Sequence, residues 1–105
     1  MKKIIILVLA IMLVGCNSNN IEKIMRENEY VIIDVRTNDE YKSKHIKGAI
    51  NIPYDELNNS LDKDKVIFVY CKSGGRSSIA YTKLTNMGYT VYDLGAFDTI
   101  DLPKE

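Results

Sequence analysis

Short apolar runs alternate along the chain with segments of helical character. Four runs, rich in β-branched residues or alternating in polarity, fit strands: residues 30–33, 49–52, 65–70 and 90–94. Three segments fit helices: residues 21–27, 38–44 and 77–87. Residues 54–60 fit one or two further helical turns. Short continuous apolar runs are typical of strands covered on both faces, as in parallel sheets. The alternation therefore predicts an α/β fold on a parallel sheet.

Capping and turn residues set the expected ends of these elements. Asn20 precedes the first helix, and Thr37 or Asn38 precedes the second, so each can supply an N-cap oxygen. Gly88 stands where a C-cap glycine belongs, after the helix at residues 77–87. We expect Gly95 to end the last strand.

The first fifteen residues are typical of an export signal rather than of a folded domain. Lys2 and Lys3 give a positive start. Residues 4–14 form an unbroken apolar run, which is too short to span a bilayer as a helix but suits the core of a signal peptide. The run also fits an uncleaved membrane anchor or an ordinary signal peptide, which are the alternatives to a lipoprotein signal peptide.

The sequence Leu-Val-Gly-Cys at residues 13–16 is similar to the lipobox of bacterial lipoproteins. The resemblance implies cleavage of residues 1–15, lipidation of Cys16, and attachment to a membrane of the bacterial cell envelope outside the cytoplasm. Residues 16–20 would be the lipidated cysteine and a short tether, and residues 21–105 the domain.

The composition excludes several kinds of binding site. The 105 residues hold 14 basic and 14 acidic side chains, so the charge is balanced and a basic nucleic-acid footprint is excluded. Two cysteines and one histidine exclude a four-cysteine zinc site and a multi-histidine metal site. If Cys16 carries lipid, Cys71 is the one remaining thiol, and a lone thiol in an exported protein is a candidate reactive group.

The chemistry that the sequence offers lies in residues 71–77, Cys-Lys-Ser-Gly-Gly-Arg-Ser. Cys71 ends a predicted buried strand, and a glycine turn and a helix start follow it. Backbone N–H groups in such a turn form an anion-binding concavity, and the helix N-terminus adds positive partial charge. With Lys72 and Arg76 adding full charges, we expect a lowered pKa and a nucleophilic thiolate at Cys71. The alternative is a structural buried cysteine with glycines that serve only the turn.

The spacing within this loop separates two chemistries. Four residues stand between Cys71 and Arg76. Cysteine phosphatases need five there, so that the loop can enclose a phosphoryl group. The shorter loop predicts a smaller cradle, suited to a single sulfur atom bonded to the cysteine.

The chain resembles the rhodanese (sulfurtransferase) domain family over about residues 21–103. The motifs that carry the resemblance are Ile-Asp-Val-Arg at 33–36, Glu-Tyr at 40–41, His-Ile-Lys-Gly-Ala-Ile-Asn-Ile-Pro at 45–53, and the loop at 71–77. The resemblance implies a small open parallel-sheet domain with helices on both faces. Because an early strand and part of the final helix are missing, we expect a domain abbreviated at both ends.

The resemblance also implies a mechanism. Cys71 would accept a sulfane sulfur from a small donor such as thiosulfate, become a persulfide, and pass the sulfur to a thiol or protein thiol. Arg76 is the expected second catalytic residue, and no metal or organic cofactor is implied. The expected substrate-binding residues are Lys72, Ser73, Gly74, Gly75 and Ser77.

Departures from the family pattern keep two other functions open. The family's common tryptophan after the last strand is missing, and Phe97 or Ile100 is expected to fill its space. A catalytically weak binding module and a thiol-redox partner acting through Cys71 are the alternatives. We expect structural roles for His45 and for Arg36, the latter paired with Glu40.

Overall fold

The computed structural model describes residues 18–105. The expected signal peptide at residues 1–15 and the expected lipidation at Cys16 lie outside the described residues. Within residues 18–105, every helix is too short or too polar to cross a bilayer.

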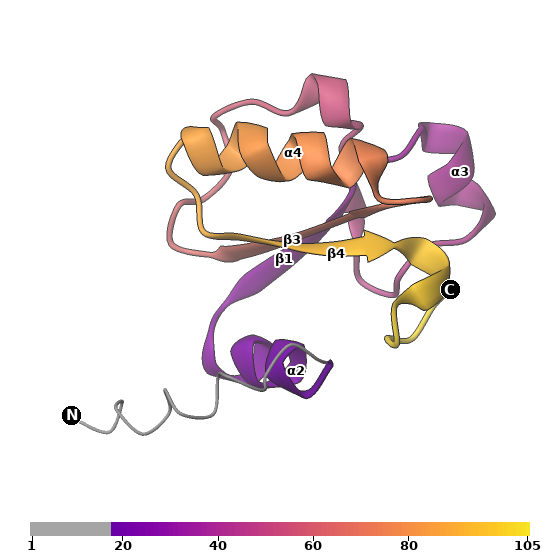
Figure 1. Ribbon diagram of the computed structural model, residues 1–105, viewed down its shortest axis with the longest axis horizontal. Coiled ribbons are helices and arrows are strands. Elements are labelled where there is room, and N and C mark those ends of the chain that lie inside the picture. Colours follow the sequence, from indigo (N-terminus) through magenta and orange to yellow (C-terminus); the bar gives the residue numbers. More distant parts are fainter. Residues whose placement is uncertain (1–17) are drawn as a thin grey trace.

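The fold is centred on a four-stranded sheet in which every pair of neighbouring strands is parallel (Figure 1). The strands lie in the order β2-β1-β3-β4. Their bounds are Tyr30–Asp34 for β1, Ile50–Asn51 for β2, Val66–Cys71 for β3 and Val91–Ala96 for β4. The parallel α/β sheet predicted from the sequence is therefore confirmed.

Helices cover both faces of the sheet, as expected. In Figure 1, α4 (Gly75–Asn86) lies on one face and α2 (Ser18–Glu27) on the other. The helix α3 (Asn38–Ser43) follows β1, and two short 3-10 helices complete the fold, η1 (Tyr54–Glu56) and η2 (Phe97–Thr99). Crossovers of this kind bring the carboxyl ends of β1, β2 and β3 to one edge of the sheet, where ligands bind in open parallel sheets.

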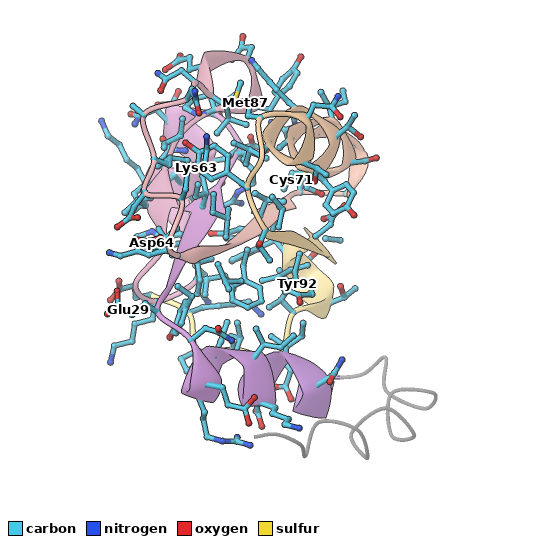
Figure 2. The ribbon with its side chains drawn as sticks, turned by 90° about the vertical axis from the view of Figure 1, so that its left-hand side faces the viewer. Glu29, Lys63, Asp64, Cys71, Met87 and Tyr92 are labelled. Carbon is cyan, nitrogen blue, oxygen red and sulfur yellow. The ribbon has the colours of Figure 1, made fainter. Side chains whose placement is uncertain are left out.

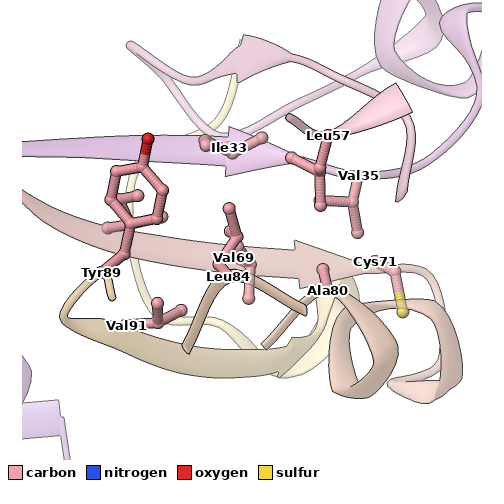
Figure 3. Packing of buried hydrophobic residues seen from close by; sticks show 10 residues of the cluster. Ile33, Val35, Leu57, Val69, Cys71, Ala80, Leu84, Tyr89 and Val91 are labelled. Carbon is pink, nitrogen blue, oxygen red and sulfur yellow. The ribbon is translucent and has the colours of Figure 1, made fainter. Parts of the chain in front are cut away.

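Each face of the sheet packs its own hydrophobic cluster. The α4 side holds ten buried residues, shown in Figure 3: Ile33, Val35, Leu57, Ile67, Val69, Cys71, Ala80, Leu84, Tyr89 and Val91. The α2 side holds six: Ile32, Ile46, Ala49, Phe68, Tyr70 and Ile100. Figure 2 shows Met87 on the α4 side and Tyr92 on the α2 side. Because consecutive residues of β3 point to opposite faces, its continuous apolar run feeds both clusters.

Two expected capping features are confirmed. Thr37 is the N-cap of α3, and its side chain accepts from the Glu40 N–H while the Glu40 side chain accepts from the Thr37 N–H. This reciprocal arrangement is a capping box. Gly88 follows the end of α4 with φ 97°, the left-handed conformation that a C-cap glycine supplies.

Three expected ends are wrong. The helix α2 begins at Ser18, so Asn20 lies inside it and is not its cap. The helix α4 begins at Gly75, two residues before Ser77. The strand β4 continues through Gly95. Its pairing with β3 shifts register there, since Val69 pairs with Asp93 but Tyr70 pairs with Gly95, and Gly95 takes φ 82° at the shift. The glycine there accommodates an irregularity of the strand instead of ending it.

Candidate active site

Cys71 is the last residue of β3, and α4 begins four residues later. Its place at the end of the buried strand and beside the start of α4 is visible in Figure 3. The residue has no exposed surface. A reagent therefore does not reach the sulfur from solvent in this conformation.

Backbone N–H groups converge on the Cys71 sulfur. The Gly74 N–H donates to Sγ with an N···S distance of 3.0 Å, and the Ser77 N–H donates at 3.3 Å. Gly74 is the N-cap of α4 with φ 102°, which an L side chain rarely adopts. Gly75 has no positive φ and is simply the first residue of the helix. Of the two glycines expected to shape the cradle, Gly74 is therefore the one whose backbone requires glycine.

These donors lower the pKa of Cys71. Burial alone raises the pKa of the thiol, since burial penalises the thiolate. Hydrogen bonds from the Ser77 side chain and from the N–H groups of Ser77, Gly74 and Ser73 oppose burial and outweigh it. The net result is a pKa below the ordinary value for cysteine, which is the direction expected from the sequence.

Ser77 contributes to the site from a fully buried position. Its Oγ lies 3.2 Å from the carbonyl oxygen of Gly74, and its hydroxyl also interacts with the Cys71 sulfur. A serine has one hydroxyl proton, so it can serve only one of these acceptors at a time. A thiolate is the stronger acceptor, and its formation favours the bond to sulfur.

The two basic residues of the loop are placed differently. The Lys72 side chain is exposed, as is Ser73. Arg76 is partly buried and pairs with Glu40, with Nη1 donating to Oε1 at 2.8 Å and Nη2 to Oε2 at 3.2 Å. The bond to Glu40 is the largest cause that raises the pKa of Arg76, and the negative charge of Cys71 also contributes.

Glu40 is the residue of this site that reasoning from the sequence missed. We expected Glu40 to pair with Arg36, whereas the structure pairs it with Arg76, in the first turn of α4. The Thr-x-x-Glu spacing of Thr37 and Glu40 predicts the capping box, but no local pattern shows that the same carboxylate reaches Arg76, which lies 36 residues along the chain.

A buried ion pair next to β3 explains the position of Arg36. Its guanidinium contacts Asp34, with Nη2 donating to Oδ2 at 2.7 Å, and lies 4.5 Å from the centre of the Phe97 ring. The Tyr70 hydroxyl donates to Asp34 Oδ2 at 2.6 Å and accepts from the Ile46 N–H. The expected Arg36–Glu40 pair is thus wrong, because Asp34, fully buried and two residues away, offers Arg36 a closer partner.

His45 lies at the start of the segment that contacts the C-terminus. Its Nδ1 is 2.8 Å from the Tyr41 carbonyl oxygen, its Nε2 is 3.3 Å from Glu105, and its ring stacks on Tyr41. These contacts join α3 to the end of the chain and none of them involves Cys71, which agrees with a structural role. Among residues 18–105, no group of three His, Cys, Asp or Glu side chains is arranged to hold a metal ion.

Comparisons with known proteins agree on one family. The family model described as the rhodanese-like domain matches residues 18–98. Thiosulfate sulfurtransferase PspE of Escherichia coli (strain K12) is 40% identical over 78 residues, which cover 69% of this chain and 75% of that protein. A tRNA sulfurtransferase of Thermoplasma acidophilum is 39% identical over 62 residues, which are 59% of this chain but only 13% of that protein.

The structural comparison points the same way. A solved structure titled rhodanese with anions, from E. coli, matches with a TM-score of 0.67 and 36% sequence identity. The match covers 72% of this chain and 96% of that one. The similarity therefore extends over nearly the whole of that solved chain.

Proposed function

Because the chain belongs to the rhodanese-like domain family, we propose that it is a sulfurtransferase or persulfide carrier that works through Cys71. A sulfane-sulfur donor such as thiosulfate would load Cys71, and a thiol or protein thiol would unload it. The similarity to a thiosulfate sulfurtransferase supports sulfur transfer in general. The observation that carries the proposal for this chain is the cradle of N–H groups around the Cys71 sulfur.

The proposed reaction has two balanced steps. In the first, the Cys71 thiolate attacks the terminal sulfur of thiosulfate, the sulfur–sulfur bond of the donor breaks, and sulfite leaves with the electron pair. In the second, an acceptor thiolate attacks the terminal sulfur of the Cys71 persulfide, the sulfur–sulfur bond to Cys71 breaks, and the acceptor becomes a persulfide while Cys71 leaves as the thiolate. No net oxidation or reduction occurs, and the covalent intermediate divides the transfer into two simpler steps.

The loop supplies what these steps need. The terminal sulfur of a persulfide carries negative charge, and N–H groups fixed by the fold stabilise that charge without reorganisation. The Gly74 and Ser77 N–H groups already point at the cysteine sulfur, and the N-terminus of α4 adds to the field. By its exposed position, Lys72 is proposed to attract an anionic donor, and Arg76 is proposed to orient it, while the backbone of Ser73, Gly74, Gly75 and Ser77 forms the cradle.

The burial of Cys71 bears on the two alternatives. A mixed disulfide would join Cys71 Sγ itself to a sulfur of a folded partner, which its burial opposes, whereas an acceptor thiol attacks the outer sulfur of the persulfide, one atom further from the strand. The structure therefore offers no specific support for thiol-redox chemistry. A binding module would not require the lowered pKa of Cys71. Sulfur transfer needs both the small cradle and the thiolate, and we favour it for that reason.

Intact-mass measurement of the full-length protein in mild detergent tests the proposal. After reduction, the protein is exposed to thiosulfate and separately to polysulfide. We expect a gain of one sulfur atom that thiol removes and that Cys71→Ser abolishes, while Cys16→Ser retains it. No gain from either donor in a folded protein would refute sulfur transfer, and capture of a partner that survives Cys71→Ser would support the binding module instead.

Export and lipidation at Cys16 form a separate proposal that rests on the sequence alone. Residues 1–15 would be removed, and Cys16 would anchor the domain to a membrane of the bacterial envelope, outside the cytoplasm. Metabolic labelling with a fatty acid in bacteria tests this directly. Label on the wild type that is lost in Cys16→Ala supports the anchor, and an unlabelled wild type rejects it.

A further inference from the structure

Glu40 engages both terminal nitrogens of the Arg76 guanidinium. Arg76 Nη1 donates to Oε1 at 2.8 Å and Nη2 donates to Oε2 at 3.2 Å, so the carboxylate binds the arginine in a fork. Such paired bonds fix orientation as well as proximity. The arginine side chain is 29% exposed and the glutamate side chain 28%, so the pair lies at the border between loop and solvent.

Glu40 is itself held in place by the start of α3. The Thr37 N–H donates to Glu40 Oε1 at 3.0 Å, and the Thr37 hydroxyl donates to the same oxygen at 3.2 Å. The capping box therefore holds the carboxylate independently of Arg76. The bond from Arg76 is also the main reason that the pKa of Glu40 falls to about 2, so this carboxylate stays ionised at any ordinary pH.

The pairing changes what the loop presents to a donor. A free Arg76 would add a full positive charge beside Cys71, as the sequence suggested. In the structure, the fixed negative charge of Glu40 offsets it, and the local attraction for an anion comes mainly from the N–H groups that face the sulfur. A second negative charge on the donor strengthens its attraction to the site. That gain is smaller at a site that offers only N–H groups than at a site that also holds an unpaired cation.

We propose that Glu40 is a positioning residue that acts through Arg76: the net charge of the Glu40–Arg76 pair sets how strongly the site prefers doubly charged sulfur donors over singly charged ones. This inference rests on the proposed function. It assigns a role to a carboxylate of α3, a different element from the strand that ends at Cys71.

Two donors of similar shape isolate the effect of charge. Thiosulfate is a dianion, and the methanethiosulfonate anion replaces one of its charged oxygens by a methyl group. In both cases the Cys71 thiolate takes the terminal sulfur and becomes a persulfide. The leaving group is sulfite from thiosulfate and methanesulfinate from methanethiosulfonate, so charge and electrons balance in each reaction.

Four proteins form a ladder of charge at the pair. The wild type is neutral there, Glu40→Gln is positive, Arg76→Gln is negative, and the double variant is neutral again. Glutamine also satisfies the N3 position of a capping box, so Glu40→Gln removes the charge while it can keep the cap of α3. Asp39→Asn is the matched control, since Asp39 is an exposed acid in the same first turn and has no ion pair among the described residues.

The readout is the concentration dependence of Cys71 persulfide formation with each donor, followed by intact mass. We expect Glu40→Gln to raise the preference for thiosulfate roughly threefold or more, and Arg76→Gln to lower it by a similar factor, as for one charge at a partly exposed site. The change should fall on the half-saturating donor concentration more than on the maximal rate. The double variant should return close to the wild-type preference, and Asp39→Asn should match the wild type.

A salt titration gives a second test that leaves Glu40 intact. In Arg76→Gln, loading by thiosulfate should become faster as salt is added, because salt screens the repulsion between the unpaired Glu40 carboxylate and the dianion. The wild type should respond less.

The outcomes separate this inference from the proposed function. If the wild type gains sulfur but the ladder or the salt response is absent, or if Asp39→Asn equals Glu40→Gln, the role of Glu40 is overturned and sulfur transfer stands. If the double variant keeps the low preference for thiosulfate that Arg76→Gln shows, Arg76 acts without Glu40 and the inference is overturned. If neither donor loads the wild type, the proposed function fails and this inference fails with it.

Discussion

The Ser77 hydroxyl offers a direct test of how the loop lowers the pKa of Cys71. The other donors to the sulfur are backbone N–H groups, which a side-chain substitution cannot remove. Ser77→Ala deletes the hydroxyl and leaves those N–H groups in place. Ser78→Ala is the matched control, because Ser78 is the next residue of α4 and its side chain is exposed.

The expected size follows from the chemistry of the lost bond. A hydrogen bond to a charged group contributes about 1.5–3 kcal/mol, and one pKa unit corresponds to about 1.4 kcal/mol. The neutral thiol gains little from the hydroxyl, which can donate to the Gly74 carbonyl instead. Ser77→Ala should therefore raise the pKa of Cys71 by about one to two units. At a pH below both pKa values, the thiolate fraction should fall by about tenfold to a hundredfold.

Ultraviolet absorbance of the thiolate, titrated against pH, measures this pKa without reference to any activity. Subtracting the titration of Cys71→Ser removes the contributions of Cys16 and the tyrosines. If sulfur transfer is the function, the rate of persulfide formation should follow the same curve, and the two proteins should converge at a pH above both pKa values. A pKa in Ser77→Ala that matches the wild type, or an equal rise in Ser78→Ala, would refute the reasoning.

The remaining predictions concern stability. Gly74→Ala should destabilise the fold by about 1–2 kcal/mol, because φ is 102° there, whereas Gly75→Ala in the first turn of α4 should not; chemical denaturation of both variants compares them. The Glu40 carboxylate has its pKa lowered from 4.5 to about 2, so the stability it contributes is present above pH 4.5 and is lost as the pH falls toward 2. The stability difference between wild type and Glu40→Gln should accordingly shrink over that range, and a constant difference would contradict the assignment. Tyr70→Phe should cost about 1–3 kcal/mol, since it removes a buried hydroxyl from Asp34; unchanged thermal unfolding would count against that contact's importance.

Local patterns in the sequence determined most of the elements and placed the proposed nucleophile, Cys71, at the end of a strand. The apolar runs at residues 30–33 and 66–70 favour strands that are covered on both faces, as in the layered α/β fold that is observed. The same logic placed Cys71 at the carboxyl end of a buried strand and before a helix, where backbone N–H groups gather. These features depend on residues that are neighbours along the chain, so they can be predicted from the sequence.

The tertiary structure alone decided which charged groups meet. Arg36 lies within four residues of both Asp34 and Glu40, and the structure pairs it with the buried Asp34. Arg76 and Glu40 are 36 residues apart and are brought together because α3 and the loop after β3 meet at the same edge of the sheet. Ion pairing depends on distance in space and on burial, and neither is encoded in a local pattern. The position of Cys71 beside converging N–H groups was therefore visible in the sequence, whereas the pairing of the charged groups around it was not.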